Sequence, residues 1–309
     1  MQFHKLLLLG SVGWLSMAGL SAEPLKVAVS VLPQAGFVER VGGSHVEVIV
    51  LVDEGKDPHS FSPTPKRVTS ITEADIWFTS GMPFEDPLLK KMKQRKDGPL
   101  IVSMNQGIDL APSADCEHHH HDHEHEHEEH AENEGEEEHH AHDHHDHGEF
   151  DPHSWLSPAL IPVQLVTIAS ELGKLDPEHA DEFEANASAF ADEVFDLDER
   201  LVADLAPLKG STFYVFHAAF GYFSGAYGLT QEAIETGGRE PSAKHLTKLI
   251  DDARKDGVKL IFVQPQFSDA SARKIAEQIG ATVLSVDPLD KDVLGTLRSI
   301  ADAVKASRG

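Results

Sequence analysis

The stretch LKVAVSVLPQAGFVERVGGSHVEVIVLV, residues 25–52, decides the fold class. Its two ends, residues 25–31 and 46–52, are apolar and rich in valine, which is typical of strands buried on both faces of a parallel sheet. Between them, Pro33 suits the first turn of a helix, and Gly42 and Gly43 suit its end. A strand, a helix and a second strand in this order predict a βαβ unit.

The same alternation continues on both sides of a central helical region. Thr64 and Pro65 are expected to start a helix, and residues 159–173 to form one that stops at Gly173. Further strands are predicted at residues 75–80, 99–103, 212–217, 259–264 and 282–287, with a weaker one at 229–234. Further helices are predicted at residues 242–256, 268–280 and 290–306.

One long amphipathic helix is predicted between the two α/β regions. From Pro177 to Leu205, apolar residues recur at spacings of three and four, and at about 1.5 Å per residue such a helix is roughly 42 Å long. A helix of this length suits a rigid strut between two lobes, although periodicity alone also fits a helix packed inside one domain. The expected architecture is α/β, with two lobes that each hold a parallel sheet flanked by helices, joined by this rigid helix. The expected boundaries are 23–176 for the N-terminal lobe, 177–206 for the linking helix and 207–309 for the C-terminal lobe.

The first 22 residues have the features of a secretory signal peptide. Lys5 supplies a positive charge, residues 6–20 are mostly apolar, and Ser21 and Ala22 are small residues that suit signal peptidase. The alternative is a membrane anchor, but about fifteen apolar residues are few for a membrane span. No cysteine lies near the cleavage point. We therefore expect an exported, periplasmic chain with no direct membrane anchor.

Charge excludes some classes of partner. The chain has 26 Lys and Arg against 52 Asp and Glu, which argues against nucleic acid and anionic membranes. Much of the excess lies in residues 115–149, a low-complexity insertion with fifteen acidic residues, fourteen histidines and no Lys or Arg. Such a polar segment is expected to be a disordered loop of the first lobe. The only cysteine, Cys116, excludes an intramolecular disulfide.

The histidines of this insertion can bind divalent ions weakly. One interpretation is a capture or reservoir loop for zinc, and the alternative is a solubilising insertion whose metal binding is incidental. Imidazoles on a floppy chain also take copper and nickel, so the insertion is not expected to supply selectivity. The auxiliary weak ligands predicted here are His118, His119, His120, His121, His123, His125, His127, His139, His140, His142, His144, His145 and His147.

A phrase that occurs twice points to a tighter metal site. The segments DPHSFSP at 57–63 and DPHSWLSP at 151–158 each place a proline directly before a histidine, His59 and His153. A third histidine, His217, is predicted to end the strand 212–217, and ligands collect at the carboxyl ends of parallel strands. Three imidazoles with a carboxylate or water form a natural four-coordinate zinc site. Asp287, at the end of the strand 282–287, is the predicted fourth ligand.

The aspartates of the repeated phrase are assigned a supporting role. Asp57 and Asp151 could hydrogen-bond the ring nitrogen that does not bind metal and so fix the tautomer of each histidine. For one Asp-Pro-His alone, a simple turn would be the better interpretation. The remaining histidines, His45, His179 and His245, are not expected to bind metal at this site.

Four motifs in this order resemble the ZnuA family of periplasmic zinc-binding components of ABC importers, within the metal-binding cluster A-I (cluster 9) of solute-binding proteins. They are GKDPHSFSPTPKRV, DPHSWLSP, FHAAFGYF and FVQPQFSDASARKIAEQIGATVLSVDPL. The resemblance implies that metal binds in the cleft between two α/β lobes. It implies His59 and His153 as ligands from the first lobe, His217 as a ligand from the second, and Asp287 as a ligand by analogy with several relatives. Gln264 departs from the glutamate that many relatives have, and the disulfide of some zinc-specific members is impossible here.

The implied function is capture of Zn²⁺ and its delivery to an inner-membrane ABC permease and its ATPase by a monomeric, non-enzymatic protein. Manganese- and iron-binding relatives commonly have glutamate where His217 stands, and three imidazoles favour zinc. A manganese receptor of the same family and a periplasmic zinc buffer or chaperone remain alternatives. A zinc hydrolase is the alternative from the enzyme class, but no further acid–base constellation accompanies the histidines.

Overall fold

The structure is a computed structural model that describes residues 23–113, 150–236 and 239–307. The predicted signal peptide and the predicted auxiliary histidines, with Cys116, lie outside the described residues. Within the described part of the chain, no helix is both long enough and apolar enough to cross a membrane.

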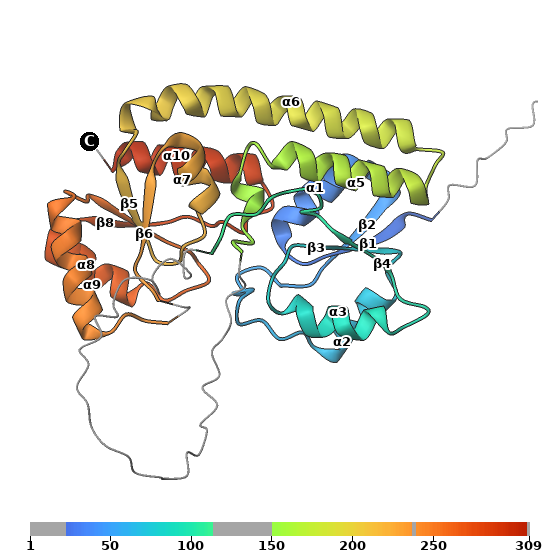
Figure 1. Ribbon diagram of the computed structural model, residues 1–309, viewed down its shortest axis with the longest axis horizontal. Coiled ribbons are helices and arrows are strands. Elements are labelled where there is room, and N and C mark those ends of the chain that lie inside the picture. The colour runs from blue at the N-terminus through green and yellow to red at the C-terminus, as the bar shows by residue number, and fades with distance from the viewer. Residues whose placement is uncertain (1–22, 114–149, 237–238, 308–309) are drawn as a thin grey trace, which may run out of the picture.

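The first lobe is built on a four-stranded parallel sheet in the order β2-β1-β3-β4 (Figure 1). The strands are β1 (Leu25–Val29), β2 (Val46–Val50), β3 (Ile76–Thr79) and β4 (Leu100–Ser103). Helix α1 (Leu32–Gly42) and the short 3₁₀ helix η1 (Gly43–His45) connect β1 to β2, so the predicted βαβ unit is confirmed. Thr64 caps α2 (Pro65–Thr72), as its sequence predicts.

The second lobe repeats this architecture with a parallel sheet in the order β6-β5-β7-β8. The strands are β5 (Thr212–Val215), β6 (Thr230–Ala233), β7 (Leu260–Val263) and β8 (Thr282–Ser285). The helices are α7 (Gly221–Tyr227), α8 (Ala243–Lys255), α9 (Ala270–Ile279) and α10 (Val293–Ala306). Two parallel sheets flanked by helices confirm the predicted fold class.

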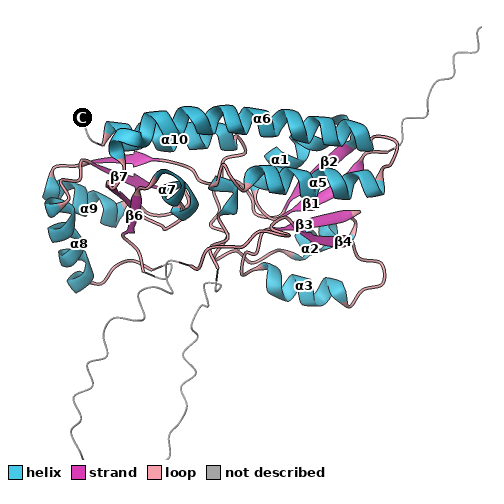
Figure 2. Cartoon of the chain, turned by 45° about the horizontal axis from the view of Figure 1, so that its top comes forward, coloured by secondary structure: helices cyan, strands magenta, loops and turns pink. Residues whose placement is uncertain are grey.

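Helix α6 (Ala180–Leu205) runs along both lobes, over α5 (Ile161–Leu175) on one side and α10 on the other (Figures 1 and 2). The predicted apolar stripe is its buried face, formed by Phe183, Ala187, Phe190, Val194, Leu197, Leu201 and Leu205. The short 3₁₀ helix η4 (Ala206–Leu208) follows it. One cluster of buried apolar side chains extends from the first sheet through α5, α6 and α10 to one face of the second sheet. The lobes are therefore joined by a continuous apolar core and not by a linking segment alone.

Three details differ from the sequence-based expectations. Helix α5 continues past Gly173 to Leu175, and the missing side chain of Gly173 leaves room for Ala180 at the start of α6, because a Cβ there would lie 3.1 Å from the Cβ of Ala180. Helix α3 (Glu85–Lys93) was not predicted, and its Pro87 lies in the first turn, where proline is tolerated. Strand β5 ends at Val215, so His217 follows the strand instead of ending it.

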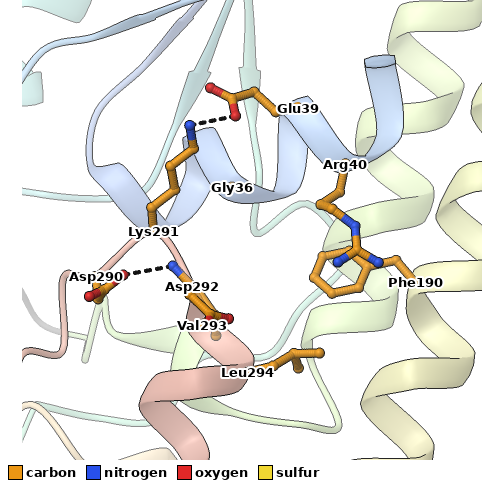
Figure 3. A pocket seen from close by; sticks show the side chains of 9 residues that line it. All are labelled: Gly36, Glu39, Arg40, Phe190, Asp290, Lys291, Asp292, Val293 and Leu294. Atoms are coloured by element: carbon orange, nitrogen blue, oxygen red, sulfur yellow. Dashed lines mark hydrogen bonds and ion pairs between the residues drawn. The ribbon is translucent and has the colours of Figure 1, made fainter.

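The two lobes meet closely on the side of α1, at a hollow between α1, α6 and the segment before α10 (Figure 3). The backbone of Gly36 in α1 approaches Lys291 so closely that a Cβ on Gly36 would lie 2.3 Å from the carbonyl oxygen of Lys291. The Nζ of Lys291 lies 2.5 Å from a carboxylate oxygen of Glu39. The guanidinium of Arg40 lies 4.2 Å from the centre of the Phe190 ring. These contacts pack the second lobe closely against the first.

Gly36→Ala is expected to destabilise the protein by about 1–3 kcal/mol, since the added methyl group overpacks a backbone contact between the lobes. Urea unfolding measures the change. Gly225→Ala is the matched control, because it also lies in a helix, α7, and a Cβ there meets nothing within 4 Å. Equal stability of the two variants would contradict the tight junction.

Candidate metal centre

Three histidines from distant parts of the chain converge between the lobes. One potential ligand nitrogen from each of His59, His153 and His217 lies within 4.8 Å of the others. The two nearest, Nε2 of His59 and Nε2 of His217, are 3.1 Å apart. Two nitrogens bound about 2.05 Å from a tetrahedral zinc ion are about 3.3 Å apart, so the spacing already matches a shared ion. The structure therefore brings together the three histidines that the sequence singles out.

The repeated Asp-Pro-His phrase positions the first two rings. In each copy, the backbone N–H of the histidine donates to Oδ1 of the aspartate two residues earlier, at 2.9 Å for both His59 and His153. In the second copy, Nδ1 of His153 also lies 2.7 Å from Oδ1 of Asp151. In the first copy, the remaining hydrogen bonds of Asp57 go to the N–H and hydroxyl of Ser60. Asp151 therefore contacts the ring of His153, whereas Asp57 contacts the backbone of His59 and Ser60, and the orienting roles of both stay predictions.

The third ring is held by two buried side chains of the second lobe. Nδ1 of His217 lies 2.8 Å from Oε1 of Glu235, which follows β6. Gln264, which is fully buried after β7, accepts from the backbone N–H of His217 at 3.1 Å and donates to its carbonyl oxygen at 2.6 Å. A carboxylate that accepts from Nδ1 fixes the tautomer and leaves Nε2 with a lone pair for a metal ion.

The charge of the surroundings suits a divalent cation. Asp151 and Glu235 are buried, with 8% and 6% of their surfaces exposed, and each touches the ring of one histidine. A dication bound by neutral imidazoles would have two negatively charged carboxylates behind the rings, and these would balance its two positive charges. His153 and His217 are also buried, so water would have limited access to the ion. These features describe a candidate site for a divalent metal ion.

The predicted fourth ligand, Asp287, is not a member of this histidine group. Its Oδ1 accepts from the amide of Gln266 at 2.9 Å and from the backbone N–H of Leu289 at 2.9 Å. Gln266 in turn lines the small cavity at the three histidines. Its buried Oε1 has no hydrogen-bond partner among the described residues. Asp287 is therefore placed to orient Gln266, and direct ligation by Asp287 stays a prediction.

The sequence did not indicate Glu235 or Gln266. Glu235 follows the weakest predicted strand. It lies 18 residues from His217 in the sequence, so no short-range pattern links the two residues. Parallel pairing of β5 with β6 brings the ends of the two strands together, so only a correct strand order could have found this contact. Gln266 lies inside a motif quoted above, in FVQPQFSD, but its role is visible only beside Asp287.

Two polar contacts tie the lobes together beside the histidines. The hydroxyl of Tyr222 in α7 donates to the carbonyl oxygen of Asp151 at 2.9 Å and accepts from the N–H of Ala111 at 3.1 Å. The indole N–H of Trp155, in the 3₁₀ helix η3 (Ser154–Leu156), donates to the carbonyl oxygen of Pro288 at 2.8 Å. Because both contacts cross between the lobes, they fix His153 relative to His217.

Comparison with known proteins identifies the family. The family model described as "ZnuA: Zinc-uptake complex component A periplasmic" matches residues 27–306. The high-affinity zinc uptake system protein ZnuA of Bacillus subtilis is 29% identical over 287 residues, covering 92% of this chain and 82% of its own. The zinc-binding protein AdcA of Streptococcus pyogenes is 31% identical over 275 residues, and the match covers 88% of this chain but only 52% of AdcA.

Solved structures agree with the described architecture. A crystal structure of ZnuA superposes with a TM-score of 0.79 at 34% identity, covering 93% of this chain and all of that chain. The solute-binding protein FpvC of Pseudomonas aeruginosa, solved in complex with Mn²⁺, has the same fold with a TM-score of 0.71 at 22% identity, covering 93% of this chain and 99% of its own. The fold is therefore shared by proteins that carry different metal ions.

Glu235→Gln is expected to weaken zinc binding by about 10- to 100-fold, because an amide is a poorer acceptor than a carboxylate and removes a balancing negative charge. Competition with a zinc chelator measures the affinity. Asp57→Asn is the comparison variant, and its effect should be smaller, since the hydrogen bonds of Asp57 go to backbone and to Ser60. A larger effect at Asp57 would contradict this assignment.

All three tyrosines of the chain are expected to ionise above the usual range. Burial raises the pKa of Tyr222 to about 12, and burial also raises the pKa of Tyr214 and Tyr227, helped by Asp256 and Asp198 respectively. In the unfolded chain these phenols ionise near pH 10. The folded state then holds more protons, so the free energy of unfolding should fall as pH rises from about 10 to 12. Absorbance at 295 nm should show no phenol titrating near pH 10 before unfolding.

Proposed function

We propose a function from one premise, that this chain belongs to the ZnuA family of periplasmic zinc-uptake components. Members of this family are metal-binding proteins that serve ABC transporters outside the cytoplasm, and they are not enzymes. The hydrolase alternative is therefore set aside. In our proposal, the chain captures Zn²⁺ in the periplasm as a monomer and delivers it to an inner-membrane ABC permease driven by an ATPase. The observation that carries it is the convergence of His59, His153 and His217.

The donor set supports zinc as the cargo. Three imidazole nitrogens with two buried carboxylates behind them suit zinc better than manganese, which prefers oxygen ligands. The manganese alternative would be favoured by a carboxylate in place of one ring. Asp287 or a water completes the set in this proposal. The buried Oε1 of Gln266 is available to accept a hydrogen bond from such a water.

The histidine- and acid-rich insertion supports a role in capture. Its flanks are joined by an antiparallel bridge between Pro112 and Phe150 and by a hydrogen bond of 2.8 Å from the N–H of Asp151 to the carbonyl oxygen of Ala111. The described residues on both sides of the insertion therefore lie close to the segment that carries His153. In this proposal the insertion raises local zinc concentration, while the three histidines supply the affinity.

Replacing His59, His153 and His217 by alanine is expected to lower the affinity of the tightest zinc site by at least roughly 1,000-fold, whereas deleting residues 117–148 should leave that site in place. Isothermal titration with a competing chelator measures both variants. Weak zinc binding by the histidine-rich insertion should fall below about pH 6.5, where free imidazole gains a proton. Tight binding that follows the deletion instead of the triple replacement would refute the assignment.

Zinc uptake separates a transport receptor from a periplasmic buffer or chaperone. A strain that lacks this chain should lose zinc uptake in chelator-treated medium and regain it with the wild-type chain. The triple alanine variant should not restore it. Normal uptake without the chain would favour the buffer or chaperone alternative.

A further inference from the structure

A second group of metal-binding side chains lies away from the three histidines. Potential ligand atoms of His45, Asp176 and His179 lie within 4.8 Å of one another. His45 ends η1, Asp176 caps the C-terminal end of α5, and His179 caps the N-terminal end of α6. Three separate elements therefore bring these side chains to one point of the first lobe.

This group lies at the amino-terminal end of β2, whereas the metal centre lies beyond its carboxyl-terminal end. His45 directly precedes β2, whereas His59 lies in the loop that follows β2. Strand β2 has five residues of about 3.3 Å each, so its two ends are roughly 16 Å apart. The two groups therefore cannot share one ion.

The contacts of His179 prepare it as a ligand. Its Nδ1 lies 2.7 Å from Oδ2 of Asp176. This is the arrangement of His153 with Asp151 and of His217 with Glu235, in which a carboxylate on Nδ1 leaves Nε2 for a metal ion. The same carboxylate–imidazole pairing thus recurs outside the cleft.

A second carboxylate lies beside His45. Nε2 of His45 lies 3.3 Å from Oε2 of Glu182, three residues after His179 on the first turn of α6. Residues three apart on a helix present their side chains on one face. Asp181 and Glu182 in this turn, with Asp176, also offset the positive end of the helix dipole, which would otherwise repel a cation.

The two rings already touch. The rings of His45 and His179 are stacked with their centres 3.7 Å apart, above the buried Phe183. A shared ion needs both lone pairs to aim at one point, so the rings must turn out of the stack. Their side chains are 24% and 32% exposed, which leaves room for that rotation and a path for an ion from solvent.

We propose that His45, His179 and Glu182, with Asp176 orienting His179, form an accessory site for one zinc-class divalent cation. Two imidazoles and a carboxylate with an open position are a common zinc ligand set. Because the ligands come from the start of β2 and the start of α6, the bound ion fastens the long helix to the first sheet. The site is more exposed than the metal centre, so its ion is bound more weakly and is not the cargo. This proposal does not depend on the proposed function.

Residue-specific protection tests the site in the full chain. Histidines are modified with diethylpyrocarbonate at pH 7, with and without zinc in excess over all histidines, and the rate at each is read by peptide mass spectrometry. Zinc should slow modification of His45 and His179 by at least fivefold and leave His245, which lies on α8, unchanged. Glu182→Gln should reduce the protection of both rings. Rates that zinc does not alter, or protection that is undiminished in Glu182→Gln, would overturn the proposal.

A crystal grown with zinc gives an independent measurement. Anomalous scattering at the zinc edge should show a peak between His45, His179 and Glu182 in the wild-type protein. The peak should be absent from a His45→Gln, His179→Gln double variant, while the peak at the three histidines of the cleft persists. A wild-type crystal with an occupied cleft and no peak at His45 would overturn the accessory site.

Discussion

Three imidazole nitrogens carried by loops of two different lobes must keep a common geometry to bind one ion, and this requires lobes that hold a fixed relative position. The structure meets that requirement with apolar packing between the lobes. The core passes without interruption through α5, α6 and α10, and Gly36 lets the backbones of the lobes touch near Lys291. Tyr222 and Trp155 then add hydrogen bonds across the junction beside the ligands. A site preorganised in this way loses little conformational entropy when an ion binds.

Rigidity has a consequence for release of the ion. If the lobes do not separate readily, the ion must leave by movement of a smaller part. His59 is the least buried of the three histidines, and it lies in the loop between β2 and α2, which contributes few members to the core. His153 and His217 are each held by a buried carboxylate. The three histidines therefore differ in burial, with His59 partly buried and the other two buried.

Sequence patterns captured the regular elements because burial on a periodic face leaves a local signature. The valine-rich runs predicted strands in their correct places, and the stripe from Phe183 to Leu205 predicted the buried face of α6 residue by residue. The repeated Asp-Pro-His phrase singled out His59 and His153, which the structure brings together, because each copy of the phrase is a local pattern. The contact between Glu235 and His217 was not predicted, because it depends on the pairing of β5 with β6. The predicted helix end at Gly173 was wrong, because the glycine there makes room for Ala180 of another helix and does not end α5.

A histidine next to a carboxylate is therefore not enough to identify a cargo site in this chain. His153, His179 and His217 each have a carboxylate oxygen within 2.8 Å of Nδ1, yet their surroundings differ. Two of them are buried between lobes, where the paired carboxylate cannot be screened by water, and the third is about one third exposed on one lobe. Burial strengthens the attraction between a dication and the carboxylate behind each ring, because the effective dielectric constant falls. The carboxylate on Nδ1 leaves Nε2 available to a metal ion, and the burial of the pair affects how strongly that ion is attracted.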